Sequence, residues 1–231
     1  MNHDQQEIDK FQELANQWWD PQGPLKSLHD INPIRLSWIT EQCELNNKRV
    51  LDVGCGGGIL TESLALSGAQ ATGLDLAKPL IDTAKLHALE HKVSVDYHCI
   101  DVGDFAKQHA GEFDVVTCME LLEHVPDPAS LIQHCSNLLK PGGHIVFSTI
   151  NRNPKAYLFA IVAGEYVLRL LPKGTHDYKQ FIKPAELDAW CRQADLKIDK
   201  FHGMSYRPLQ KRYYLCDDIS VNYLAAAKKA G

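Results

Sequence analysis

The sequence lacks the features that mark secreted, zinc-binding and membrane-spanning chains. Its 7 cysteines are odd in number and include no CxxC pair, so we expect reduced thiols in a cytosol-like compartment. The opening residues are polar and acidic, whereas a secretory signal needs a basic start and an apolar run. The most apolar stretch, residues 156–171, falls short of the roughly 20 residues that span a bilayer. We therefore expect a cytoplasmic protein.

The sequence also has no surplus of positive charge. It holds 24 Lys and Arg residues against 29 Asp and Glu residues, a formal net charge of -5, which argues against nucleic acid as a partner. Hydrophobic residues make up 45% of the chain and charged residues 23%, close to the average for globular domains. We therefore expect a packed core, and 231 residues suit a single domain.

Local patterns divide this domain into four parts. Residues 1–46 predict a helical arm, because apolar side chains recur at spacings of three and four. Residues 48–150 alternate apolar runs with helical stretches, which is typical of a doubly wound, Rossmann-like α/β fold with a mostly parallel sheet. Residues 151–183 predict a helical insertion after the fifth strand. Residues 184–231 predict a helix at 184–194 and strands at 196–202 and 213–223.

A glycine-rich bend follows the first expected strand, in the segment VLDVGCGGG (50–58). Such a bend lets backbone N–H groups approach a ligand with no side chain between them. The pyrophosphate-binding pattern G-x-G-x-x-G is incomplete, because Ile59 stands where the last glycine is needed. Asp75 ends the second strand, where a carboxylate can accept hydrogen bonds from both ribose hydroxyls. Asp52 lies inside the first strand. Burying its carboxylate there costs free energy unless the carboxylate accepts hydrogen bonds from the loop or meets a cationic ligand.

These features favour a positively charged nucleoside over a dinucleotide. A nicotinamide-dependent oxidoreductase is the weaker alternative, because it would need the missing glycine. A further alternative is a binding module that has lost catalysis, although the residues of the ligand loop are all present.

Four segments, in this order and spacing, resemble the class I S-adenosylmethionine-dependent methyltransferases: VLDVGCGGG, GLDLA (73–77), FDVVTCMELLEHVPDP (113–128) and LLKPGGHIVFSTINR (138–152). A closer resemblance covers nearly the whole chain. The segments WWDPQGPLKSLHDINPIR (18–35), STINRNPKAY (148–157) and LPKGTHDYKQFIKPAEL (171–187) resemble the ubiquinone biosynthesis O-methyltransferase family.

The resemblance implies a seven-stranded sheet whose last strand is antiparallel, with S-adenosylmethionine at the ends of its first two strands. It implies methylation of phenolic hydroxyls on a polyprenylated catechol and on demethylubiquinol. Another phenolic or small-molecule acceptor stays the alternative. The resemblance also implies two kinds of partner, the polyprenyl phenol as substrate and other proteins of the ubiquinone pathway. Carried over motif by motif, the expected cofactor contacts are Arg35, Gly54, Asp75 and Met119. The glycine bend and the first strand add Gly56 and Asp52 as expected contacts.

The segment E-x-x-E-H after the fourth expected strand holds the catalytic candidates Glu120, Glu123 and His124. A phenol is a poor nucleophile until it loses its proton, which happens unaided near pH 10. If the segment is helical, the three side chains share one face. His124 would then act as general base, or the three residues would hold Mg²⁺ or Zn²⁺. The third interpretation is that Glu123 and His124 only brace the loop before Pro126.

Two further segments carry expectations about access to the site. The apolar residues 156–171 are flanked by basic residues and are expected either to lie on the anionic inner face of the cytoplasmic membrane or to form a lid or dimer helix. The flanking residues are Arg152, Lys155, Lys173, Lys179 and Lys183. The pair Trp18 and Trp19 either covers the cofactor or anchors the arm.

Overall fold

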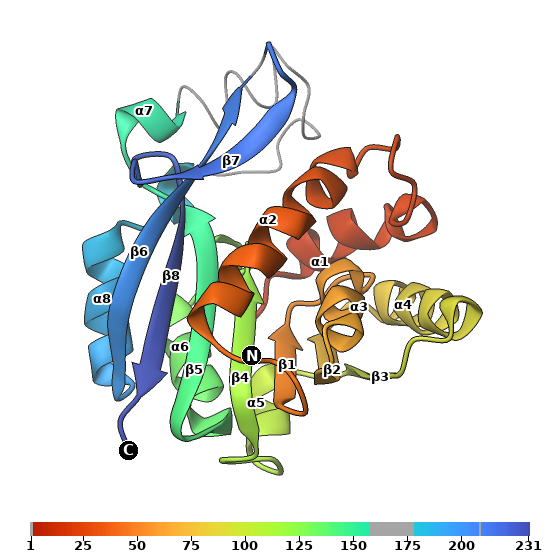
Figure 1. Ribbon diagram of the computed structural model, residues 1–231, viewed down its shortest axis with the longest axis horizontal. Coiled ribbons are helices and arrows are strands. Elements are labelled where there is room, and N and C mark those ends of the chain that lie inside the picture. The colour runs from red at the N-terminus through yellow and green to blue at the C-terminus, as the bar shows by residue number, and fades with distance from the viewer. Residues whose placement is uncertain (1, 158–177, 208) are drawn as a thin grey trace.

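One mixed sheet forms the centre of the fold in the computed structural model of the chain (Figure 1). The structure describes residues 2–157, 178–207 and 209–231. In this part of the chain the sheet has eight strands in the order β3-β2-β1-β4-β5-β8-β6-β7. The strands are β1 Arg49–Val53, β2 Gln70–Asp75, β3 Val95–Cys99, β4 Phe113–Met119, β5 Leu139–Ile150, β6 Leu196–Arg207, β7 Arg212–Cys216 and β8 Asn222–Lys229.

The strands β1 to β5 are parallel, as expected for strands that alternate with helices. Strand β1 lies between β2 and β4, with Val50 paired to Ala71 on one side and to Val115 on the other. The chain order therefore reverses at β1, and a crevice opens at the carboxyl ends of the strands at such a point. The ends of β1, β2 and β4 thus meet where a ligand is expected.

The described helices are α1 Gln5–Gln12, α2 Lys26–Gln42, α3 Ile59–Leu66, α4 Lys78–His91, α5 Val102–Ala106, α6 Pro128–Leu138, α7 Pro154–Ala156 and α8 Pro184–Gln193. They cover both faces of the sheet. Val115 of β4 packs with α2 and α3, whereas the next residue, Val116, packs with α6 and α8 on the other face. This alternation follows from the two-residue period of a strand.

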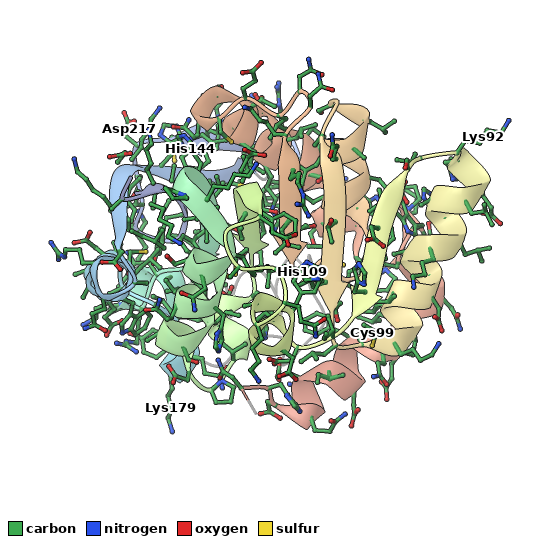
Figure 2. The ribbon with its side chains drawn as sticks, turned by 90° about the horizontal axis from the view of Figure 1, so that it is seen from below. Lys92, Cys99, His109, His144, Lys179 and Asp217 are labelled. Carbon is green, nitrogen blue, oxygen red and sulfur yellow. The ribbon has the colours of Figure 1, made fainter. Side chains whose placement is uncertain are left out.

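Helix α4 lies against the outer strand β3 (Figure 2). Tyr97 of β3 is buried in one cluster with Ile81 and Ala84 of α4. The labelled residues Cys99 and Lys92 mark the end of β3 and the residue after α4. Helix α4 therefore covers one face of the sheet at this outer strand.

The antiparallel part of the sheet differs from the expectation in one respect. Strand β8 lies between β5 and β6 and runs antiparallel to both, so a mostly parallel sheet that ends in antiparallel strands is confirmed. The prediction of one strand over 213–223 is wrong, because β7 and β8 are separate strands. The backbone turns between them, where Asp218 accepts a hydrogen bond from the Ser220 N–H at 3.0 Å. Strand β7 therefore adds an eighth strand to the described sheet as a hairpin with β6.

The helical arm and the start of the insertion are also present. Helix α1, a 3₁₀ turn at Ala15–Gln17 and helix α2 form the arm, and the insertion begins with α7. The segment 158–177 lies outside the described residues, so the expectation for 156–171 stays a prediction. Within residues 2–157, 178–207 and 209–231, no helix is long and apolar enough to cross a membrane.

Candidate active site

A cavity of about 630 Å³ lies at the carboxyl ends of β1, β2 and β4. It is lined by the end of each strand, by the arm and by the strands β6 and β7. Every predicted site residue lines it except Glu123. Those residues are Arg35, Asp52, Gly54, Gly56, Asp75, Met119, Glu120 and His124.

The glycine loop has the side-chain-free backbone that the sequence predicts. Gly54 has φ 74° and Gly56 has φ 55°, in the left-handed region that favours glycine. A Cβ atom on Gly54 would lie 2.8 Å from Leu121, and one on Gly56 would lie 2.3 Å from Trp18. The N–H groups of Gly54 and Cys55 donate to the Leu74 carbonyl at 2.8 and 2.9 Å, which fixes the loop against β2.

The two tryptophans of the arm pack directly on this loop. Trp18 is 6% exposed, lies against Gly56 and Gly57, and also lines the cavity. Trp19 donates from Nε1 to the Gly57 carbonyl at 2.9 Å, and its ring stacks on His87 with a centroid distance of 3.4 Å. The arm is therefore anchored on the glycine loop, and Trp18 covers part of the cavity as well.

Asp75 presents its carboxylate at the end of β2. Its oxygens accept hydrogen bonds from the Gly56 N–H at 2.9 Å and the Ala77 N–H at 2.8 Å. Burial raises the pKa of Asp75, and these backbone hydrogen bonds oppose that rise. Each carboxylate oxygen can accept a second hydrogen bond, so the group suits a pair of ribose hydroxyls.

Asp52 is buried at 3% exposure in β1. The sequence left two explanations for this burial, hydrogen bonds from the loop or a cationic ligand. The donors in the structure are the hydroxyls of Thr61 and Thr117, each at 2.7 Å. Burial raises the pKa of Asp52 to about 6, although both hydroxyls and the nearby Arg35 charge lower it. Thr61 and Thr117 were missed because a threonine within a helix or strand pattern does not show which distant group its hydroxyl contacts.

Arg35 and Glu120 form the charged pair of the cavity. The Arg35 guanidinium is buried, and its Nη2 lies 3.1 Å from Oε1 of Glu120. Within the described residues, the Arg35 Nε atom has no hydrogen-bond acceptor, and Nη2 has Glu120 as its ion-pair partner. Burial would raise the pKa of Glu120, but the Arg35 charge and hydrogen bonds from Ser148 and Asn222 outweigh it and lower the pKa. An incoming carboxylate would satisfy the free Nε–H group of Arg35.

Glu123 lies beneath the cavity and is 2% exposed. Its Oε2 accepts a hydrogen bond from the Thr149 hydroxyl at 2.6 Å, and its Oε1 has no partner within the described residues. Burial, followed by the charge of Glu120, raises the pKa of Glu123 to about 8. The carboxyl group is therefore mostly protonated at neutral pH.

His124 is held by a residue that sequence reasoning missed. Its Nδ1 lies 2.7 Å from Oε2 of Glu7 in α1, and its ring meets Phe11 edge to face with centroids 5.4 Å apart. The hydrogen bond from His124 lowers the pKa of Glu7 to about 2. Asn2 adds a second link, because it donates to the Asp127 carbonyl at 2.6 Å and accepts from the Asp127 N–H at 2.8 Å. The first helix thus covers the cavity.

The residues of the E-x-x-E-H segment do not converge as a metal site. Glu120 has φ 51°, outside the helical range, so the expectation of one shared helical face is wrong. Glu120 meets Arg35, Glu123 meets Thr149 and His124 meets Glu7. In residues 2–157, 178–207 and 209–231, no three His, Cys, Asp or Glu side chains are placed to hold a metal ion. The arrangement present does not fit Mg²⁺ or Zn²⁺.

Comparisons with known proteins agree with this site. Residues 31–200 match the family model of a methyltransferase domain. The magnesium protoporphyrin IX methyltransferase of Synechocystis PCC 6803 with bound SAH has a TM-score of 0.71 at 19% identity, over 96% of this chain and 95% of that one. The same methyltransferase with bound SAM has a TM-score of 0.65 at 17% identity, over 97% of each chain. The matched family model and the shared fold place the chain among the methyltransferase domains.

Two curated relatives narrow the class. The ubiquinone biosynthesis O-methyltransferase of Aromatoleum aromaticum is 56% identical over 230 residues, which cover 100% of this chain and 98% of that protein. The protein of the same name from Dechloromonas aromatica is 57% identical over 224 residues, 97% of each. The chain belongs to the ubiquinone biosynthesis O-methyltransferase family. The family that the motifs resembled is confirmed by this membership.

Proposed function

We propose that the chain methylates phenolic hydroxyl groups of polyprenylated catechol and demethylubiquinol intermediates, with S-adenosylmethionine as donor. The observation that carries the proposal is a cavity that joins a side-chain-free loop, the carboxylate of Asp75 and the buried guanidinium of Arg35. A nucleoside with an amino-acid tail needs a ribose acceptor and a carboxylate-binding group in one site. The names of the relatives above support the acceptor class.

The residues around the loop have complementary roles toward the donor. Asp75 binds the ribose hydroxyls, and the free Nε–H group of Arg35 binds the carboxylate. Glu120 stays ionised and orients the guanidinium. Asp52 is mostly ionised above pH 6 and favours a cationic ligand. Met119, at the end of β4, supplies a polarizable apolar contact. Bound S-adenosylmethionine supplies a methyl group on a positively charged sulfur.

His124 is the general base in this proposal. It lines the cavity, and the Glu7 carboxylate fixes its ring orientation and stabilises the imidazolium that forms when it takes the phenol proton. Glu123 is less suited, because it lies outside the cavity lining and is already protonated at neutral pH. Glu120 is occupied by Arg35. Holding donor and acceptor in line supplies much of the remaining rate, roughly 7 to 11 kcal/mol.

The acceptor side of the cavity lies toward the C-terminal strands. Met204, Tyr206, Tyr213 and Val221 line it, so the wall is largely apolar with two hydroxyl groups. Such a wall suits an aromatic ring with an apolar tail. Because a polyprenyl tail partitions into lipid, we place the enzyme peripherally on an anionic membrane surface, in reach of other ubiquinone-pathway proteins.

Calorimetry and turnover test the proposal. The full chain should bind S-adenosylmethionine and its demethylated product, but not NADH, and should methylate a short-chain polyprenyl catechol. A catechol without the tail is the control for acceptor class. Binding without turnover of either catechol would refute the proposed reaction, and equal kcat/KM for both would favour a different phenolic acceptor. A rate lost on chelation and restored by magnesium or zinc would revive the metal hypothesis for Glu120, Glu123 and His124.

A further inference from the structure

The side-chain amide of Asn222 is only half satisfied. Its Nδ2 group donates to the carboxylate of Glu120, at 3.3 Å from Oε1 and 3.4 Å from Oε2. Its Oδ1 atom is buried, and no group within the described residues donates a hydrogen bond to it. A buried acceptor without a donor costs free energy, and most such groups in folded proteins are satisfied. A ligand that brings a donor to Oδ1 would remove this cost.

Glu120 fixes which end of the Asn222 amide faces it. The carboxylate is ionised beside Arg35, so it accepts hydrogen bonds and donates none. Only the NH₂ end of the amide can therefore face Glu120, because a reversed amide would set two acceptors against each other. The amide oxygen is thus held on the side away from Glu120, as an acceptor in a fixed place.

Asn222 belongs to the acceptor side of the cavity. It lies in β8 and is paired with Ile150 of β5 and with Met204 of β6, and all three residues line the cavity. Paired residues of neighbouring strands project from the same face of a sheet. Figure 1 shows β8 beyond β5, away from β1 and β2, where the donor is bound in the proposed function. Two strand spacings, about 10 Å, separate β8 from β4.

The missing partner of Oδ1 must be a hydrogen-bond donor. An amide oxygen only accepts, whereas the hydroxyls of Tyr206 and Tyr213 on the same wall can donate as well as accept. A catechol has two neighbouring hydroxyl groups. One of them loses its proton and receives the methyl group, and the other keeps its proton and can donate it to an acceptor.

We propose that Oδ1 of Asn222 accepts a hydrogen bond from the second hydroxyl of the catechol, the one that is not methylated in that turnover. This inference rests on the proposed function, because it requires a phenolic acceptor. The bond holds the ring with its first hydroxyl toward the donor. Asn222 thereby selects catechols, since a phenol with a single hydroxyl leaves the buried oxygen unpaired.

The ammonium group of S-adenosylmethionine is another donor that could meet an amide oxygen. The position of Asn222 favours the catechol, because β5 separates its strand from β4 and its paired neighbours Ile150 and Met204 are apolar. An apolar wall with one fixed acceptor suits a ring that carries a hydroxyl. The two possibilities differ in what a substitution of Asn222 would change, the preference among acceptors or the affinity for the donor.

The test compares two acceptors and four forms of the full chain. The acceptors are a short-chain polyprenyl catechol and the same molecule without its second hydroxyl. Asn222→Leu keeps a similar side-chain shape and removes both hydrogen-bonding groups, and Asn222→Ala is a second variant that introduces no bulk. The control is Ser148→Ala. Ser148 also donates to Oε1 of Glu120, at 2.8 Å, but it lies outside the described lining of the cavity.

The quantity measured is the ratio of kcat/KM for the catechol to kcat/KM for the single-hydroxyl phenol. The intrinsic reactivity of each acceptor is the same for every form of the chain, so a change in the ratio reports binding by the protein. We expect the ratio to fall about 10- to 100-fold in Asn222→Leu and in Asn222→Ala, as for a lost hydrogen bond in a buried site. The ratio should stay unchanged in Ser148→Ala.

The outcomes separate this inference from the proposed function. If the unchanged chain methylates neither acceptor, the proposed function is wrong. If it methylates the catechol but the ratio is the same in both Asn222 variants, only the inference is wrong. An equal fall for both acceptors, together with a higher Kd for S-adenosylhomocysteine by calorimetry, would assign Asn222 to the donor and would overturn the inference. An equal fall of the ratio in Ser148→Ala would also overturn it, because the effect would then act through Glu120.

Discussion

The side chains of Glu7 and His124 meet at 2.7 Å, although 117 residues separate them in the chain. The first helix therefore supplies a carboxylate to the residue that follows the fourth strand, and it covers the cavity at the same place. A carboxylate that accepts the ring N–H of a histidine fixes the orientation of the ring. This contact thus links the proposed general base to the helix that covers the cavity.

Replacing the carboxylate of this pair should slow the chemical step. We expect Glu7→Gln to lower kcat roughly 10- to 100-fold while the KM for a short-chain catechol changes little, because the base keeps its place but loses its orienting charge. Glu7→Asp should recover part of the loss. Glu13→Gln, an exposed change on the same arm, is the control. An unchanged kcat in Glu7→Gln would show that Glu7 does not position the base.

The role of Arg35 can be isolated with a truncated ligand. We expect Arg35→Lys to raise the Kd for S-adenosylhomocysteine about 10- to 100-fold, because an ammonium cannot replace the fork of a buried guanidinium. Calorimetry with 5′-methylthioadenosine, which lacks the carboxylate, should give the same Kd for variant and unchanged chain. A similar loss for both ligands would mean that the substitution disturbs the whole cavity.

The glycine loop can be tested with two glycines of similar backbone conformation. Gly54 has φ 74° and Gly111 has φ 69°, but an added Cβ meets Leu121 at 2.8 Å only at Gly54 and meets nothing within 4 Å at Gly111. Gly111→Ala should lower the free energy of unfolding by about 1 to 2 kcal/mol and leave activity intact. Gly54→Ala should lower it further and weaken S-adenosylmethionine binding at least tenfold, as measured by urea unfolding and calorimetry. Equal effects would contradict a close approach of ligand and loop.

The raised pKa of Glu123 predicts how the free energy of unfolding depends on pH. Its pKa is raised from 4.5 to about 8 in the folded chain, so its contribution to stability is fully present below pH 4.5 and is lost as the pH rises through 8. The glutamine in Glu123→Gln cannot ionise. The variant should therefore keep a few kcal/mol of unfolding free energy that the unchanged chain loses between about pH 5 and about pH 9. Urea unfolding at both pH values measures this, with the exposed Glu90→Gln as control. Parallel pH curves for the unchanged chain and Glu123→Gln would refute the raised pKa.

Much of the fold was predictable because its signals are local. The first strand, the glycine bend and Asp75 are read from short segments, since strand and turn preferences depend on neighbouring residues. The split of 212–229 into β7 and β8 was missed although Asp217 and Asp218 favour a turn, because strand-like residues lie on both sides of them. Arg35 was expected at the cofactor by resemblance, but its pairing with Glu120 needed the packed helix α2.

The sequence by itself determined a loop without side chains between the first strand and the helix that follows it, because glycine acts through its own backbone. It also determined an acid, Asp75, at the end of the second strand, because aspartate acts through its own charge. The tertiary structure alone decided what Glu120, Glu123 and His124 do. A left-handed backbone at Glu120 sends the three side chains to Arg35, Thr149 and Glu7, and no helical spacing could show this. Partners that lie far apart in the chain are chosen by packing, which a local pattern does not record.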